Sequence, residues 1–217
     1  MKTQLILLRH GQPELQNCLL GQTDSKLTDL GWQQMQESCM ALRDVDQVIT
    51  SPLLRCKQFA IDYAIKNGIS FECVAEFQEC NFGDWDGLSY QQLNKKHSKE
   101  FEFFLDSPSK YHPPNGESLF DFNCRIDMAL KLAFEEYKGK KILLVSHAGV
   151  IRSLVAWCLK LDRLSNIPFR SFSIDYASQT HLDLFLGDTQ FLGDKQSSGE
   201  NVFSQLKNLN IVPRGFS

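Results

Sequence analysis

Three short, mostly apolar runs in this sequence are each followed by turn-forming residues and then by a helical pattern. The runs have the length of buried strands and span residues 4–8, 47–50 and 141–145. The helical patterns that follow them span residues 28–43, 51–64 and 150–161. A repeated strand–turn–helix unit builds a mostly parallel sheet that is covered by helices. The sequence therefore predicts an α/β fold.

The remaining segments extend this prediction. Ser51 and Pro52 are expected to act as N-cap and first residue of the second helix. Residues 117–137 read as a long amphipathic helix, residues 106–115 as a proline-containing surface loop, and residues 171–186 as one or two strands. In the tail, a short helix is expected at 202–209. We expect one domain over residues 1–217, with a loop excursion at about 80–117 and a variable tail at about 187–217.

Composition narrows the class of function. The formal net charge of -3 argues against nucleic-acid binding, because proteins that bind phosphate backbones usually carry a basic excess. The seven scattered cysteines include no CxxC pair, so neither a disulfide framework nor a metal site is indicated. The apolar run before Arg9 is too short for a signal peptide or a membrane span. These features predict a cytoplasmic protein that is not bound to a membrane.

Two histidines, His10 and His147, each follow an apolar strand run and precede a glycine turn. Parallel strands bring both to the carboxyl edge of one sheet, where α/β proteins bind ligands. One such histidine is more often structural than catalytic, but two with neighbouring arginines favour catalysis. Phosphoryl transfer needs a nucleophile, cations on the phosphoryl oxygens and an acid for the leaving alcohol. A neutral imidazole supplies the nucleophile, and Arg9 and Arg55 supply the cations.

The tetrapeptide Leu8-Arg9-His10-Gly11 resembles the RHG signature of the histidine phosphatase superfamily, which includes the cofactor-dependent phosphoglycerate mutases. Five further blocks of that family recur in order, at residues 21–31, 51–60, 79–87, 115–117 and 146–152. The resemblance implies a three-layer α/β/α sandwich with a mostly parallel central sheet. It also implies a phosphate pocket of Arg9, His10, Arg55 and His147, transient phosphorylation of His10, and Glu79 as the proton donor.

Other residues of these blocks are candidates for substrate or phosphate binding, namely Gly21, Gln22, Asn115 and Ala148. Glu79 lies between an apolar stretch and an aromatic-rich turn, and partial burial there would suit a general acid. The family commonly has Thr and Asn at the second and fifth positions after RHG, whereas this chain has Pro13 and Gln16. Either Gln16 or Asn17 is therefore expected to replace the phosphate-contacting Asn. Asn115 to Glu117 can also be read as a plain turn and helix start.

Competing classes have weaker support. Residues 44–48 fit the DxDxV pattern of aspartyl-phosphate phosphatases, but they follow a helix rather than a strand. No cysteine has an Arg six residues later, as a cysteine phosphatase requires, and Cys56 and Cys80 are expected to be inert. We expect no metal and no cofactor.

Within the family, hydrolysis of a small-molecule phosphomonoester is favoured, because the chain lacks the insertion of the longer mutases. Its blocks most resemble those of the bacterial alpha-ribazole phosphatases, which remove the 5'-phosphate of alpha-ribazole phosphate. A broad metabolite phosphatase, a phosphoglycerate mutase and a phospho-ligand-binding pseudo-phosphatase remain alternatives. The oligomeric state is open, with a dimer as one option.

Overall fold

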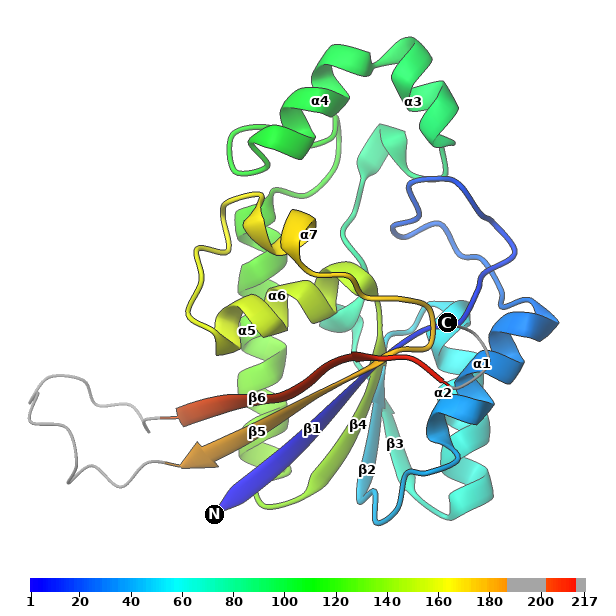
Figure 1. The fold of residues 1–217 in the computed structure, drawn as a ribbon, viewed down its shortest axis with the longest axis vertical. Coiled ribbons are helices and arrows are strands. Elements are labelled where there is room, and N and C mark those ends of the chain that lie inside the picture. Colours follow the sequence, from blue (N-terminus) through cyan, green and yellow to red (C-terminus); the bar gives the residue numbers. More distant parts are fainter. Residues whose placement is uncertain (187–201, 214–217) are drawn as a thin grey trace, which may run out of the picture.

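A six-stranded sheet forms the centre of the molecule (Figure 1). The computed structural model describes residues 1–186 and 202–213. The strand order is β3-β2-β4-β1-β5-β6. The strands span Lys2–Arg9 (β1), Gln47–Thr50 (β2), Ser70–Cys73 (β3), Lys141–Ser146 (β4), Gln179–Leu186 (β5) and Val202–Ile211 (β6).

The first four strands run parallel to one another, and β5 and β6 are antiparallel to their neighbours. This arrangement confirms the predicted mostly parallel sheet. Strand β4 lies between β1 and β2, and its register with β1 pairs Arg9 with Ser146. The residues that follow these two strand ends, His10 and His147, are therefore brought to the same edge of the sheet.

Alternation along β1 divides its side chains between two hydrophobic cores. Ile6 and Leu8 belong to the core that α1 and α2 cover, whereas Leu5 and Leu7 belong to the core that α5 and α6 cover. A strand that is apolar on both faces is typical of a parallel sheet with helices on both sides. The three-layer α/β/α sandwich is thereby confirmed. These helices span Asp29–Cys39 (α1), Leu54–Asn67 (α2), Leu119–Glu136 (α5) and Ala148–Cys158 (α6).

A helical projection rises above the carboxyl edge of the sheet (Figure 1). It contains a short 3-10 helix and two α-helices, which we together call the cap: η2 (Gly83–Trp85), α3 (Tyr90–Lys96) and α4 (Ser98–Asp106). The cap has a small core of its own around Trp85, Leu93 and Phe101. The loop excursion expected at 80–117 thus contains η2, α3 and α4, and Trp85, Leu93 and Phe101 of these helices pack on one another.

Two local predictions were wrong. The second helix begins at Leu54 with Leu53 as N-cap, while Ser51 lies before the helix and its Oγ accepts from the N–H of Leu53 (3.3 Å). Residues 202–209, expected as a short helix, belong to β6, which pairs with β5. The side chains of β6 alternate in exposure from Val202 to Lys207, so sheet pairing prevails over local helical spacing.

Two further elements connect these layers. The 3-10 helix η1 (Ala75–Phe77) follows β3, and the short helix α7 (Ile167–Ser171) precedes β5. Residues 171–186 therefore hold the end of a helix and one strand. No helix in the described part of the chain combines the length and apolarity that a membrane crossing requires.

Candidate active site

His10 and His147 face each other at the carboxyl edge of the sheet. Their ring centroids are 5.3 Å apart with an edge-to-face geometry, and the backbone N–H of His10 donates to the carbonyl of Ser146 (3.0 Å). His10 is 5% exposed and His147 is fully buried. The sequence-based expectation that the two strand ends bring these histidines together therefore agrees with the geometry.

The hydrogen bonds of His10 determine its tautomer. Nδ1 lies 2.8 Å from the carbonyl oxygen of Gly11, which can only accept, so Nδ1 carries the proton. Nε2 then keeps its lone pair. Burial, and next the positive charges of Arg55 and Arg9, hold the pKa of His10 well below its usual value. The imidazole is therefore neutral at pH 7, as a nucleophile must be.

Arg55 and His147 form a fixed pair inside the site. Nε of Arg55 donates to Nδ1 of His147 (3.2 Å), and its terminal nitrogens donate to the carbonyls of Thr23 and Gly21. Since Nδ1 of His147 accepts, its Nε2 is protonated and donates to Oγ of Ser51 (2.8 Å). Burial and then Arg55 lower the pKa of His147, so its imidazole is neutral. Two of the five N–H groups of Arg55 remain for a ligand.

Arg9 lies close enough to His10 for its charge to contribute to the lowered pKa of that histidine. Its guanidinium stacks 4.0 Å above the ring of Tyr176, and one terminal nitrogen donates to the carbonyl of Ile174 (2.6 Å). The same Tyr176 ring packs against His10, with centroids 5.7 Å apart. Tyr176 thus fixes the nucleophile candidate and one of the cations together.

The segment that holds Arg9 is itself tied to the last strand. The N–H of Asp175 donates to Oδ1 of Asn210, and Nδ2 of Asn210 donates to Oδ2 of Asp175, both at 2.7 Å. Asn210 has a φ of 55°, a left-handed conformation that Asn adopts more readily than most residues. Strand β6 therefore supports the position of Arg9 through residues 174–176.

Glu79 lies at the entrance to α6. It is 8% exposed, Oε1 accepts from the N–H of Cys80 (3.0 Å), and Oε2 accepts from the N–H of Gly149 (2.9 Å). A Cβ at position 149 would lie 2.3 Å from Oε1, so only glycine allows this approach. The expected burial of Glu79 agrees with the structure, and its carboxyl group is held by two backbone donors.

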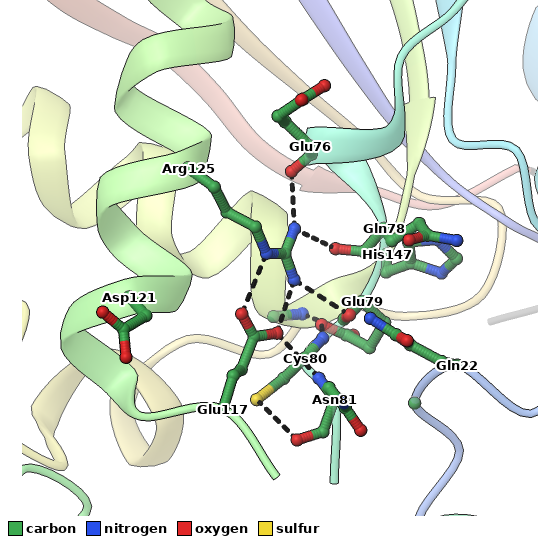
Figure 2. A network of polar contacts seen from close by, with 12 residues as sticks. Gln22, Glu76, Gln78, Glu79, Cys80, Asn81, Glu117, Asp121, Arg125 and His147 are labelled. Atoms are coloured by element: carbon green, nitrogen blue, oxygen red, sulfur yellow. Dashed lines mark hydrogen bonds and ion pairs between the residues drawn. The ribbon is translucent and has the colours of Figure 1, made fainter. Parts of the chain in front are cut away.

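Arg125 of α5 fixes the segment that carries Glu79 (Figure 2). Its two terminal nitrogens donate to the carbonyls of Glu76, Gln78 and Glu79, and its remaining donors form a two-point ion pair with Glu117 at 2.6 and 2.9 Å. All five N–H groups of the guanidinium are therefore engaged. One arginine thus sets the path of the backbone through residues 76–79.

The loop at residues 21–23 is held against the cap by one carboxylate. Asp86 accepts from the N–H groups of Gly21 (3.2 Å), Gln22 (2.7 Å) and Thr23 (3.0 Å). A Cβ on Gly21 would lie 2.3 Å from the carbonyl oxygen of Cys80, so the loop packs too closely for a side chain. This contact brings Gly21 next to Arg55, whereas Gln22 is exposed beside it.

Not every predicted binding residue lies among the side chains of Arg9, His10, Arg55 and His147 at the centre of the site. Ala148 is the first residue of α6 and follows His147 directly. Gln16 is exposed and accepts from Nε2 of Gln12 (3.1 Å), and Asn17 is exposed with a left-handed φ of 56°. Asn115 donates to both carboxylate oxygens of Asp84 in the cap, so its amide is occupied there.

Three residues that hold the site in place were not predicted from the sequence, namely Arg125, Asp86 and Tyr176. Each acts on a neighbour that lies far away in sequence, so periodicity gives no signal for it. Asp86 did stand inside a motif block, and its position there was the only available sign.

The cysteines at the site are inert thiols. Burial raises the pKa of Cys56, whose sulfur lies 3.6 Å from Nε2 of His147, and it raises the pKa of Cys80. A protonated thiol is a poor nucleophile. Across residues 1–186 and 202–213, no group of three or more His, Cys, Asp or Glu side chains is arranged to hold a metal ion.

Comparison with known proteins identifies the family. The histidine phosphatase superfamily (branch 1) matches residues 5–193. A bifunctional protein of Mycobacterium tuberculosis is 31% identical over 202 residues, which are 90% of this chain and 52% of that protein. The chain thus spans about half the length of the first curated relatives it matches. A 2,3-bisphosphoglycerate-dependent phosphoglycerate mutase of Sinorhizobium fredii is 30% identical over 176 residues, 76% of this chain and 82% of that one.

Solved structures share the fold. An alpha-ribazole phosphatase from Shigella flexneri has a TM-score of 0.77 at 23% identity, covering 96% of both chains. A mycobacterial glucosyl-3-phosphoglycerate phosphatase has a TM-score of 0.79 at 24% identity, covering 97% of this chain and 99% of that one. With the family match over most of its length, this chain belongs to the histidine phosphatase superfamily.

Proposed function

We propose that the protein hydrolyses small phosphomonoesters through a phosphohistidine at Nε2 of His10. The observation that carries this proposal is the bond from Nδ1 of His10 to the Gly11 carbonyl, which presents an unprotonated Nε2 in a buried site. The cations Arg9 and Arg55 lie close enough to His10 to lower its pKa. Together these groups match the needs of phosphoryl transfer, a nucleophile with positive charge around the transferred group.

The proposed reaction has two steps. In the first, Nε2 of His10 attacks phosphorus, the bond from phosphorus to the ester oxygen breaks, and protonated Glu79 gives its proton to the departing alcohol. In the second, water attacks the phosphohistidine, Glu79 takes a proton from that water, and phosphate leaves as the bond to Nε2 breaks. The proton removed from Glu79 in the first step is thus restored in the second.

The other side chains stabilise charge in this scheme. The donors proposed for the phosphoryl oxygens are the two free N–H groups of Arg55, the guanidinium of Arg9 and the Nε2–H of His147, which would exchange its bond to Oγ of Ser51 for one to the phosphoryl group. Because His147 is neutral, it acts by hydrogen bonding. Backbone groups of Gly21, Gln22 and Ala148 lie beside these donors. Either Gln16 or Asn17 is proposed to replace the phosphate-contacting Asn of the family, and Asn115 is proposed to contact the substrate.

For the substrate, we propose alpha-ribazole 5'-phosphate. The motif blocks of the sequence and the fold shared with the alpha-ribazole phosphatase of Shigella flexneri support this choice. A mutase activity is the second candidate, since a relative in Sinorhizobium fredii carries that name. The two candidates differ in whether water or a second alcohol accepts the phosphoryl group from His10.

The test is a rapid-quench experiment with a phosphate-labelled ester. We expect an acid-labile label on the wild-type protein, and neither label nor turnover in His10→Ala. His112→Ala is the matched control, because His112 is exposed and, among the described residues, its Nδ1 has the adjacent Pro113 carbonyl as its one hydrogen-bond partner. Release of inorganic phosphate favours hydrolysis, whereas transfer to added 3-phosphoglycerate would favour a mutase. Full turnover in His10→Ala would refute the nucleophile assignment.

We also propose that the protein works in a reducing compartment, the cytoplasm. All seven cysteines are free thiols, which supports this proposal. Its proposed partner is a small phosphorylated metabolite rather than nucleic acid.

A further inference from the structure

A cavity of about 220 Å³ lies between Glu79 and the cap. Glu79 and Gly149 contribute to its wall from the candidate active site. The rest comes from the cap and the segments next to it, from Leu19, from α5 and α6, and from α7. The apolar part of the wall is formed mainly by Leu19, Phe82, Phe101, Phe104, Leu105 and Phe169. It borders the group that is proposed to protonate the leaving alcohol, so it is placed to receive that alcohol.

The polar residues of the cavity are few and mostly engaged elsewhere. Glu117 is occupied by Arg125, and Glu79 by two backbone N–H groups. Arg152 donates Nε–H to the carbonyl of Phe172 (2.9 Å), and its terminal nitrogens have no acceptor among the described residues. Burial lowers the pKa of Arg152, and the neighbouring Glu79, Tyr90 and Asp175 offset part of that shift. The terminal nitrogens of Arg152, near the Glu79 side of the cavity, are therefore available to bind a polar group of the substrate.

Resting on the proposed function, we infer that the alcohol of the substrate carries a bulky apolar group, preferably aromatic, which this cavity binds. A cavity of about 150 Å³ accommodates benzene, so 220 Å³ accommodates one six-membered ring with space left for substituents. Aromatic walls bind ring edges and faces favourably. A hydroxyl-rich alcohol would lose hydrogen bonds to water against such walls. The aromatic base of alpha-ribazole phosphate falls within this class, and phosphoglycerate does not.

The preference is measured with three esters of primary alcohols, namely ethyl phosphate, 2-phenylethyl phosphate and glycerol 1-phosphate. All three place a similar demand on the leaving-group acid, so differences in kcat/KM report binding of the alcohol. We expect 2-phenylethyl phosphate to exceed ethyl phosphate by about 10- to 100-fold, from burial of the ring. Glycerol 1-phosphate is expected to show no advantage over ethyl phosphate.

Variants locate the preference in the cavity. Leu105→Ala and Phe169→Ala should each lower the ratio of the phenylethyl to the ethyl rate by about 3- to 10-fold. Leu105 is 46% exposed, so its truncation leaves the cap core intact. Phe103→Ala is the matched control, because Phe103 lies on the same helix, is 54% exposed and stacks on Tyr111 outside the cavity. Its ratio should stay at the wild-type value.

The outcomes separate this inference from the proposed function. Equal kcat/KM for the three esters, or a preference for glycerol 1-phosphate, would overturn the inference while leaving the phosphatase proposal in place. An unchanged ratio of the phenylethyl to the ethyl rate in both Leu105→Ala and Phe169→Ala would show that the preference does not arise in this cavity. Absence of hydrolysis of all three esters and of p-nitrophenyl phosphate would overturn the proposed function, and the inference with it.

Discussion

Replacing Arg125 with lysine should damage catalysis without touching the proposed nucleophile. Arg125 uses five N–H groups to bind Glu117 and the carbonyls of residues 76, 78 and 79. A lysine ammonium has three donors and lacks the planar fork, so at least two of these bonds are lost. Hydrogen bonds that involve a charged group contribute about 1.5 to 3 kcal/mol each, and water reaching the vacated space offsets part of this. We expect Arg125→Lys to lower the free energy of unfolding by about 2 to 4 kcal/mol.

The catalytic effect follows from the position of Glu79. Its backbone carbonyl accepts from Arg125 at 3.0 Å, so loosening of the segment moves the carboxyl group away from the leaving oxygen. A displacement on the order of 1 Å costs about 100-fold in rate. We therefore expect a 10- to 100-fold lower kcat/KM for an alkyl phosphate. The loss should be much smaller for p-nitrophenyl phosphate, whose alcohol leaves without a proton.

A second partly buried arginine provides the control. Arg163 forms a two-point ion pair with Asp127 and further bonds to Asn123 and Ser153, away from Glu79. Arg163→Lys should therefore cost similar stability and leave the ratio of the two substrate rates unchanged. The proposed role of Arg125 in positioning Glu79 is refuted if Arg125→Lys lowers the rates for the alkyl phosphate and p-nitrophenyl phosphate equally. It is also refuted if the alkyl phosphate rate stays at the wild-type level.

Three further outcomes are expected. Glu79→Gln should slow hydrolysis of an alkyl phosphate far more than that of p-nitrophenyl phosphate, whereas His147→Ala should slow both. Burst kinetics measure the phosphorylation step, and equal losses on the two substrates in Glu79→Gln would contradict its role as the leaving-group acid. Turnover should survive EDTA, since arginines supply the positive charge, and loss on chelation that magnesium restores would contradict the mechanism. Finally, burial lowers the pKa values of His10 and His147, so the folded state binds fewer protons than the unfolded one below about 6.5. Stability from this source is complete above that pH and is lost as pH falls below it. Urea unfolding between pH 8 and 5 measures the slope, which should be smaller in His10→Gln.

The sequence predicts the central residues of the candidate site because they follow apolar strand runs, which are easy to recognise from local sequence patterns. Arg9 and His10 end an apolar strand, His147 follows another, and parallel pairing brings them together. The supporting contacts could not be predicted in this way. Arg125 contacts the segment of Glu79 over 46 residues of sequence, and Asp86 contacts the loop at Gly21 over 65 residues. Such pairings depend on how the layers pack, which no local spacing encodes.

The same limit explains the wrong prediction at residues 202–209 and the helices found within the expected loop excursion at 80–117. Residues 202–209 carry apolar residues at spacings compatible with a helix, yet β5 offers an unpaired edge that takes them as a strand. Likewise, the apolar residues of the cap form their own core around Trp85 instead of remaining in a loop. In both places a distant partner decides the local structure.

The hydrogen bonds between Asp175 and Asn210 affect the stage of folding at which enzymatic activity appears. The bond from Arg9 to Ile174 joins residues 165 positions apart, and the bond from Arg55 to His147 joins residues 92 positions apart. Closing loops of this length is among the slow events of folding, whereas helices form locally and early. In a refolding experiment, helical signal should therefore return before enzymatic activity. Activity should return only when β6 docks and orders residues 174–176, so turnover reports the completed sheet rather than its parts.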